Sequence, residues 1–281
     1  MNSKKYFFDE NHVRYELCQV NGGKPYNWLF LPGGPGMDSS YLRDVASSLE
    51  LPGNVWLIDL PGNGTNEDSL RNFDTWFEIF PSVIQKFDNP ILVGHSFGGM
   101  FPLFFPELEH QLKGFVILNS APCLWLEEAV SYSKQFDLPD LSQEMQDFTR
   151  QPNRETFDAA LKACMPYYFS PSALSRGSAL VLTVPLNYLA AVWWQQKVLE
   201  THYSAKWVPQ QVPTLIIGAK FDAITPFSLF EKDTRFARDN ITMRFIEDAG
   251  HFPWIENPTA VREALTEFIS QIQSSMDEQS E

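Results

Sequence analysis

The sequence has few cysteines and a deficit of basic residues. Its three cysteines, Cys18, Cys123 and Cys164, are widely spaced and form no C-x-x-C pair. This spacing excludes a disulfide framework and predicts reduced thiols. Lysine and arginine together number 21, against 35 aspartates and glutamates, so the formal net charge is −14. Such a charge repels nucleic-acid phosphates and anionic membrane surfaces, and we expect neither as a partner.

Long apolar runs are also missing. The first ten residues, MNSKKYFFDE, reach acidic residues after only three aromatic ones, which is too short for the apolar region of a signal peptide. No segment approaches the roughly 20 apolar residues that a membrane-spanning helix requires. The sequence therefore predicts a cytoplasmic protein that does not enter a membrane, and we expect a monomer.

Short apolar runs alternate with longer amphipathic segments. The runs that predict strands are residues 27–31, 55–58, 91–93, 115–118, 214–217 and 241–246. Most are almost continuously apolar, which is typical of strands buried on both faces of a parallel sheet. Two shorter extended segments within residues 6–20 predict an antiparallel pair at the edge of this sheet.

Helices are predicted between these strands, over residues 38–49, 73–87, 226–238 and 258–273. In the last one, Asn257 is a good N-cap and Pro258 suits the first helical position. Val261, Leu265 and Phe268 then fall on one face. Alternation of strands and helices predicts an α/β fold, with a mostly parallel central sheet and helices on both faces.

One long stretch interrupts the alternation. Residues 121–208 contain no convincing strand and have helical patterning throughout, so we interpret them as a helical insertion. The alternative is that they are further helices of the same core. The insertion divides the core into residues 1–120 and 209–273, and the polar, acidic residues 274–281 are expected to form a disordered tail.

A glycine-rich turn follows the predicted strand at 91–93. In ILVGHSFGGM, residues 91–100, Gly94, Ser96 and Gly98 form the pattern G-x-S-x-G. A sharp turn from strand to helix would place the Ser96 hydroxyl at the carboxyl end of the strand, and only small neighbours fit such a turn. Ser96 is therefore a candidate nucleophile.

A serine nucleophile needs a base, and the base needs an acid. His251 lies just after the predicted strand at 241–246, so it reaches the same edge of the sheet as Ser96. Asp222 follows the predicted strand at 214–217 and is the preferred acid. Asp248 is nearer in sequence but shares the short loop of His251. The resulting order, Ser96, Asp222, His251, is the order of α/β-hydrolases.

The segment LPGGPGM, residues 31–37, offers a candidate oxyanion hole. It follows the first buried strand, and its two glycines before a proline leave main-chain N–H groups exposed at a tight bend. The amides of Gly34 and Phe97 could together stabilise a tetrahedral oxyanion.

These segments resemble the α/β-hydrolase family. PGGPG at 32–36, DLPGNG at 59–64, GHSFGG at 94–99, GAKFD at 218–222 and GH at 250–251 occur in the family's order, and the resemblance covers about residues 5 to 272. The helical insertion resembles the family's cap. The Gly-Gly-Pro-Gly loop is most similar to the H-G-G-P-G loop of proline iminopeptidase-like members.

The chain departs from that pattern at three places. Pro32 stands where the family has a histidine, and the turn reads GHSFGG where iminopeptidases usually have a Gly-Gly-Ser-Trp-Gly form. Both differences weaken the assignment as an aminopeptidase and leave the assignment as a hydrolase intact. The third departure is Pro102, which with Pro106 lies in the helix after Ser96. Pro102 deletes a backbone hydrogen bond and should kink or shorten that helix.

The resemblance implies a serine hydrolase that cleaves an ester, amide or peptide bond of a small molecule or short peptide through an acyl-enzyme. It implies no metal and no organic cofactor. An iminopeptidase would also need cap carboxylates to hold the free amine of its substrate, and Glu127, Glu128 and Glu144 are the candidates. Two alternatives stay open: carbon–carbon bond cleavage or lyase chemistry of a menaquinone-pathway type, and a ligand receptor without turnover.

Overall fold

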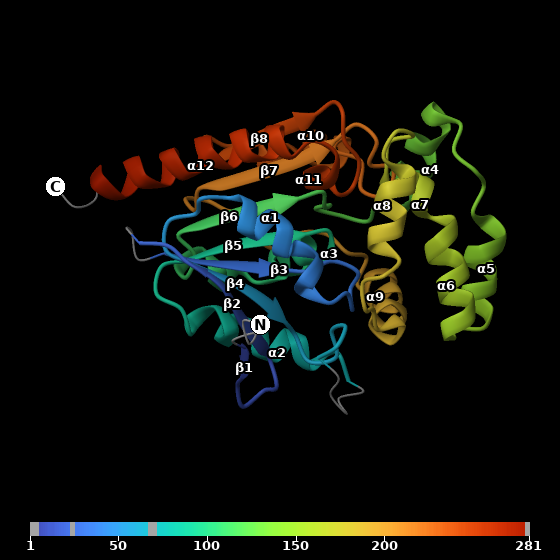
Figure 1. The fold of residues 1–281 in the computed structure, drawn as a ribbon, viewed down its shortest axis with the longest axis horizontal. Coiled ribbons are helices and arrows are strands. Elements are labelled where there is room, and N and C mark those ends of the chain that lie inside the picture. The colour runs from blue at the N-terminus through green and yellow to red at the C-terminus, as the bar shows by residue number, and fades with distance from the viewer. Residues whose placement is uncertain (1–5, 23–25, 67–71, 279–281) are drawn as a thin grey trace.

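The computed structural model describes residues 6–22, 26–66 and 72–278 of the 281-residue chain. A central eight-stranded sheet runs through the larger part of the molecule (Figure 1). Its strands are β1 (Tyr6–Phe8), β2 (Arg14–Val20), β3 (Asn27–Leu31), β4 (Asn54–Asp59), β5 (Pro90–His95), β6 (Gly114–Leu118), β7 (Thr214–Ala219) and β8 (Ile241–Ile246). Every strand predicted from the sequence is therefore present.

The strand order is β1-β2-β4-β3-β5-β6-β7-β8. The antiparallel pair β1–β2 lies at one edge, as predicted, and β2 also pairs antiparallel with β4. All pairs from β4 to β8 are parallel. The carboxyl ends of β3, β5, β6, β7 and β8 therefore meet at one edge of the sheet, where the candidate site residues follow them.

Helices cover both faces of the sheet. The helices of the two core segments are α1 (Arg43–Ser48), α2 (Thr75–Gln85), α3 (Phe97–Met100), α10 (Ser228–Glu231), α11 (Pro253–Glu256) and α12 (Pro258–Glu278). Side chains alternate along β3, so Trp28 and Phe30 pack with α1 and α12, whereas Leu29 and Leu31 pack with α2 and α3. Two separate apolar cores result. Within the described ranges, no helix has the length and apolar character needed to cross a membrane.

Two of the sequence-based boundaries were wrong. The last helix continues to Glu278, so residues 274–278 are helical and not part of a disordered tail. No glycine or proline follows Pro258 in this helix, and nothing stops its propagation. Residues 279–281 lie outside the described part of the chain. The helix predicted over 226–238 is instead two short pieces, α10 and a 3₁₀ turn, because Asp233 adopts an extended conformation and caps the amide of Arg235.

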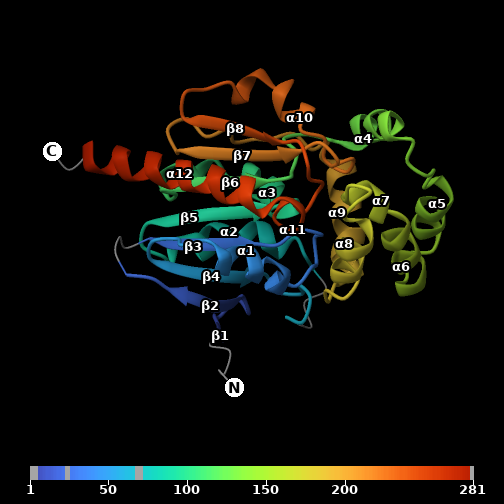
Figure 2. The same ribbon diagram turned by 45° about the horizontal axis from the view of Figure 1, so that its top comes forward.

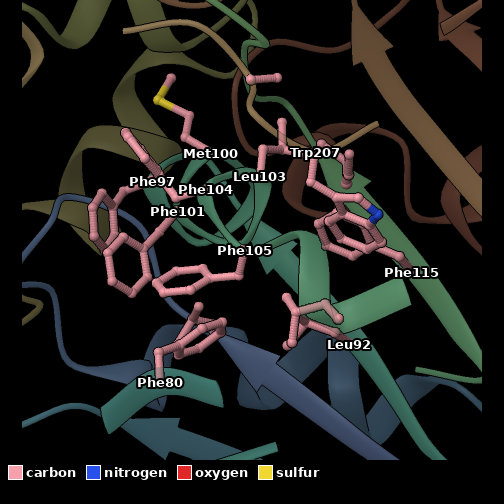
Figure 3. Packing of buried hydrophobic residues seen from close by; sticks show 14 of the residues in the cluster. Phe80, Leu92, Phe97, Met100, Phe101, Leu103, Phe104, Phe105, Phe115 and Trp207 are labelled. Atoms are coloured by element: carbon pink, nitrogen blue, oxygen red, sulfur yellow. The ribbon is translucent and has the colours of Figure 1, made fainter. Parts of the chain in front are cut away.

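The helix after Ser96 is short, as Pro102 predicted. The α-helical part ends at Met100 and continues as 3₁₀ turns over Phe101–Phe104 and Pro106–His110. Figure 3 shows the aromatic side chains of this segment packed together with Phe80 of α2. The Phe80 ring centroid lies 5.1 Å from that of Phe101 and 5.3 Å from that of Phe105. Packing of these buried aromatic rings therefore stabilises a segment that lacks the hydrogen bonds of a regular α-helix.

Residues 121–208, which we call the cap, contain helices and no strand among the described elements. The helices are α4 (Leu126–Ser133), α5 (Ser142–Arg150), α6 (Arg154–Ala163), α7 (Met165–Tyr168), α8 (Leu174–Val181) and α9 (Tyr188–Glu200). Figures 1 and 2 both place them beyond the carboxyl edge of the sheet, with α8 and α9 nearer to it than α5 and α6.

A buried ionic cluster ties β2 to the loops beside this edge. The Arg14 guanidinium donates to Asp59 Oδ2 at 2.7 Å and to Asp38 Oδ2 at 2.8 Å. Ser39 and Thr65 add further hydrogen bonds to the two carboxylates. Asp38 follows the candidate oxyanion loop, so this cluster fixes the far end of that loop.

The two carboxyl groups of the cluster differ in acidity. Burial raises the pKa of Asp59 to about 6, with Arg14 opposing the shift. Burial also acts to raise the pKa of Asp38, but hydrogen bonds from Ser40, Thr65 and Arg14 outweigh it and hold that pKa below the ordinary 3.8. Asp59 therefore contributes most to stability below pH 4, and that contribution is lost as the pH rises through about 6.

We predict that Arg14→Leu lowers the free energy of unfolding by about 3 kcal/mol at pH 8, because it leaves two buried carboxylates without a cation. The loss should be smaller at pH 5, where Asp59 is protonated. Arg244→Leu removes an exposed ion pair with Glu267 and should cost at most about 1 kcal/mol at either pH. Urea titrations of the three proteins at both pH values measure this, and equal losses for the two variants would contradict it.

Candidate active site

Ser96 occupies a strained turn between β5 and α3. Its φ is 54° and its ψ is −117°, a backbone conformation that residues other than glycine rarely adopt. A Cβ atom on Gly94 would collide with the carbonyl oxygen of Gly98, and one on Gly98 would collide with that of Leu31. The glycines of the G-x-S-x-G pattern are therefore required by the close approach of the main chain, as the sequence predicted.

The structure places Asp222 against His251. His251 Nδ1 lies 2.9 Å from Asp222 Oδ2, and both side chains are buried. Asp222 Oδ1 accepts hydrogen bonds from the amides of Ile224 and Thr225 at 3.0 and 2.9 Å. Donation from Nδ1 to the carboxylate leaves His251 Nε2 free to accept a proton. Asp248, the alternative acid, is exposed.

Sequence reasoning missed two polar residues of this site, which follow β6. Asn119 Nδ2 donates to Asp222 Oδ2 at 3.0 Å and to the Gly250 carbonyl oxygen at 3.2 Å. Ser120 Oγ donates to the Ser96 carbonyl oxygen at 2.7 Å. Their position at the carboxyl end of a strand of the parallel sheet was the available signal in the sequence.

Ser96 and His251 line the same cavity, which has two chambers. The first extends between the cap and the sheet edge and is lined by Phe157, Val181 and Phe252 among others. The second extends toward α9 and is lined by Trp194 and Val198 among others. Both include Ser96, Gly34 and Tyr168, so the two chambers meet at the candidate nucleophile. Among the described residues, the His251 ring bonds to Asp222 and Thr225 and not to Ser96 Oγ, and hydrogen bonds between catalytic groups often tighten only in the substrate complex.

The two candidate oxyanion donors lie beside Ser96. Gly34 lines both chambers and Phe97 lines the second. Among the described residues, no protein group accepts a hydrogen bond from either amide. Phe97 is the first residue of α3, where main-chain N–H groups point out of the helix end. The oxyanion role of the two amides stays a prediction that their lack of a protein acceptor within the described residues permits.

The three cap glutamates do not reach the cavity. Glu127 is exposed, and Glu128 accepts hydrogen bonds from Ser228 Oγ at 2.6 Å and Lys232 Nζ at 2.8 Å. Glu144 lies near Cys164 but is not among the lining residues. None of the three is among the described residues that line the two chambers, so the structure gives their proposed amine-binding role no support.

The described walls of the cavity are mainly apolar. Among the described residues lining the two chambers, none is a lysine, arginine, aspartate or glutamate. The walls are mainly Phe, Leu, Met, Val, Ala and Trp. Burying an unpaired charge against such walls is unfavourable, so the site suits an uncharged apolar group. In the same described part of the chain, no three potential metal ligands are grouped together.

The cap helix α7 is bonded directly to the loops of Asp222 and His251. The Tyr168 carbonyl oxygen accepts from the His251 amide at 2.7 Å, and the Tyr167 carbonyl oxygen accepts from the Ala223 amide at 3.0 Å. A Cβ on Gly250 would collide with the Tyr168 carbonyl oxygen. The glycine before His251 is therefore needed for this contact between cap and core.

We predict that Gly250→Ala lowers the free energy of unfolding by about 1–3 kcal/mol, since the added methyl group pushes against main chain. Hydrogen exchange at the His251 amide should accelerate as its bond to Tyr168 breaks. Gly22→Ala is the matched control, because a Cβ at Gly22 meets no atom within 4 Å. Equal stability of the two variants would show that the contact between α7 and the His251 loop is dispensable.

Comparison with known proteins agrees with this geometry. Residues 28–264 match the model of the alpha/beta hydrolase family. The sequence is similar to a pimeloyl-[acyl-carrier protein] methyl ester esterase from Xylella fastidiosa, with 23% identity over 86% of this chain and 94% of that protein.

Solved structures show the same fold. A proline iminopeptidase-related protein from Thermus thermophilus is 17% identical and has a TM-score of 0.72, with 96% of this chain and 98% of that chain covered. MenH from S. aureus is 16% identical and has a TM-score of 0.61, with 92% of this chain and 98% of that chain covered. These likenesses agree with the α/β architecture described above.

Proposed function

The chain belongs to the α/β-hydrolase family, and we propose that it is a serine esterase acting on uncharged esters with apolar acyl groups. One observation carries this proposal. Ser96 and His251, which is hydrogen-bonded to Asp222, line a cavity whose described lining residues include no lysine, arginine, aspartate or glutamate.

The proposed reaction proceeds through an acyl-enzyme. Ser96 Oγ attacks the carbonyl carbon of the ester while His251 Nε2 takes the hydroxyl proton. The amides of Gly34 and Phe97 donate to the oxyanion of the tetrahedral intermediate. His251 then gives its proton to the departing alcohol oxygen. A water molecule, deprotonated by His251, attacks the acyl carbon and releases the carboxylic acid and Ser96.

An ester with an apolar acyl group fits this cavity better than an aminoacyl substrate. A free α-amine is cationic at pH 7 and would need a carboxylate partner, but Glu127, Glu128 and Glu144 do not line the chambers. A substrate with free carboxylates would equally find no lysine or arginine among the described lining residues. The similarity to a methyl ester esterase agrees with ester chemistry.

We predict a matching order of turnover on a panel of substrates. The p-nitrophenyl ester of valeric acid should have a kcat/KM about tenfold or more above that of the p-nitrophenyl monoester of glutaric acid, which places a carboxylate where valerate has a methyl group. The kcat/KM for prolyl p-nitroanilide should be lower than that for the valerate ester. All turnover should disappear in Ser96→Ala. Preference for the glutarate ester or the anilide would overturn the substrate class, and turnover that persists in Ser96→Ala would overturn the mechanism.

The acid of the triad has its own test. Asp222→Asn should lower kcat by roughly a thousandfold or more, because an amide in place of the carboxylate disfavours the His251 tautomer with a proton on Nδ1. Asp248→Asn removes an exposed carboxylate three residues from His251 and should leave kcat within about twofold. Steady-state kinetics on the valerate ester measure both. A comparable loss in Asp248→Asn would reassign the acid.

A further inference from the structure

Three loops at the site are connected by a series of buried hydrogen bonds outside the Ser96, Asp222, His251 set. The Gly33 amide donates to Tyr41 Oη at 2.7 Å. Tyr41 Oη lies 2.8 Å from His95 Nδ1, and His95 Nε2 lies 2.8 Å from the carbonyl oxygen of His251. Tyr41 and His95 are 7% and 1% exposed, so water does not compete for these bonds.

The partners fix the direction of every bond in this series. A carbonyl oxygen only accepts, so His95 Nε2 must carry a proton and donate it to His251. The Gly33 amide only donates, so the Tyr41 hydroxyl accepts from it and gives its own proton to His95 Nδ1. His95 is therefore the neutral tautomer with its proton on Nε2, and each polar atom of the series is paired.

We propose that Tyr41 and His95 are positioning residues that hold the oxyanion loop, the Ser96 turn and the His251 loop in one fixed arrangement. Gly33 precedes the oxyanion donor Gly34, His95 precedes Ser96, and the accepting carbonyl belongs to His251 itself. The inference rests on the proposed function, because the fixed arrangement matters only if these three loops act together in a reaction.

Pro32, the residue before Gly33, cannot anchor the oxyanion loop through polar groups of its own other than its carbonyl oxygen. Proline has no main-chain N–H, and its ring offers no polar atom to anchor the loop. The neighbouring Gly33 is anchored instead by the Tyr41 hydroxyl, which comes from the 3₁₀ helix η1 (Ser39–Leu42). A Cβ on Gly33 would lie 2.9 Å from Ser96 Cβ, so this position also has to be glycine.

The neutral form of His95 is suited to its place beside His251. The two imidazole ring centroids are 4.8 Å apart, and Trp254 and Phe252 enclose the His95 ring. Burial and the neighbouring His251 both lower the pKa of His95 well below 6.5. His251 becomes cationic during the proposed reaction, and a second cation at this distance would oppose that step.

The first experiment compares Tyr41→Phe, His95→Leu and the double variant with wild type. Each single variant should lower kcat on the valerate ester by about tenfold or more with KM within about twofold, since misplaced catalytic groups slow the chemical step. The double variant should be no slower than the slower single variant, because both substitutions break one series. His95→Gln retains an N–H donor toward His251 and should recover part of the kcat lost in His95→Leu.

Tyr15→Phe is the matched control. It removes a buried tyrosine hydroxyl that is bonded to Asp9 at 2.8 Å, remote from the three loops, and should leave kcat within about twofold. A kcat for Tyr41→Phe that equals the control value, or multiplicative losses in the double variant, would overturn the proposal. Labelling of Ser96 by a fluorophosphonate should slow in parallel with kcat, which gives a readout even if no ester is turned over.

A spectroscopic measurement separates this proposal from the proposed function. Nitrogen-15 NMR of histidine-labelled wild type, with His95 assigned from the His95→Gln spectrum, should show the neutral Nε2–H tautomer unchanged between pH 5.5 and 8. Tyr41→Phe should change the Nδ1 signal. Titration of wild-type His95 near pH 6.5 would overturn the hydrogen-bond series whether or not the protein is an esterase. Loss of ester turnover with this signature intact would overturn only the proposed function.

Discussion

The buried carboxylate of Asp222 is the constraint on which the rest of the site depends. A charge this far from water is tolerated only when donors surround it. Those donors come from the end of β6 through Asn119, from the turn after β7 through Ile224 and Thr225, and from the loop after β8 through His251. Satisfying one charge therefore brings three strand ends together, and the geometry of the candidate base follows from it.

The same loops limit how the cap can move. The carbonyl groups of Tyr167 and Tyr168 in α7 accept hydrogen bonds from the loops of Asp222 and His251, so lifting α7 would disturb both. A path into the cavity that leaves α7 in place keeps these bonds intact. The second chamber is lined by Leu126, Met145 and Leu199, from α4, α5 and α9, and each of these exposes more than a third of its surface. Apolar side chains that extend from solvent to the cavity favour entry of an apolar group between these three helices.

Local patterns in the sequence predicted the sheet, the turn at Ser96 and the pair formed by Asp222 and His251. Strand periodicity sufficed, because functional residues of a parallel sheet collect where its strands end. The contacts of Asn119 with Asp222 and of Tyr41 with His95 span 103 and 54 residues, and no local pattern encodes such partners. Glu127, Glu128 and Glu144 are not among the described lining residues, and composition alone does not tell which way a helix faces. The length of α12 was underestimated because a polar composition was taken to mean disorder.

The charge distribution of this molecule bears on the proposed ester substrate at two ranges. The chain as a whole carries −14, so its long-range field disfavours the approach of anions before any contact is made. At short range, the described cavity walls offer no cation to an anion and no carboxylate to an amine. Salt screens the first effect within about 10 Å at 0.1 M, whereas the second acts inside the protein and is screened much less. Discrimination against charged acyl groups should therefore persist at high ionic strength, because it arises mainly from the walls of the cavity and not from the net charge.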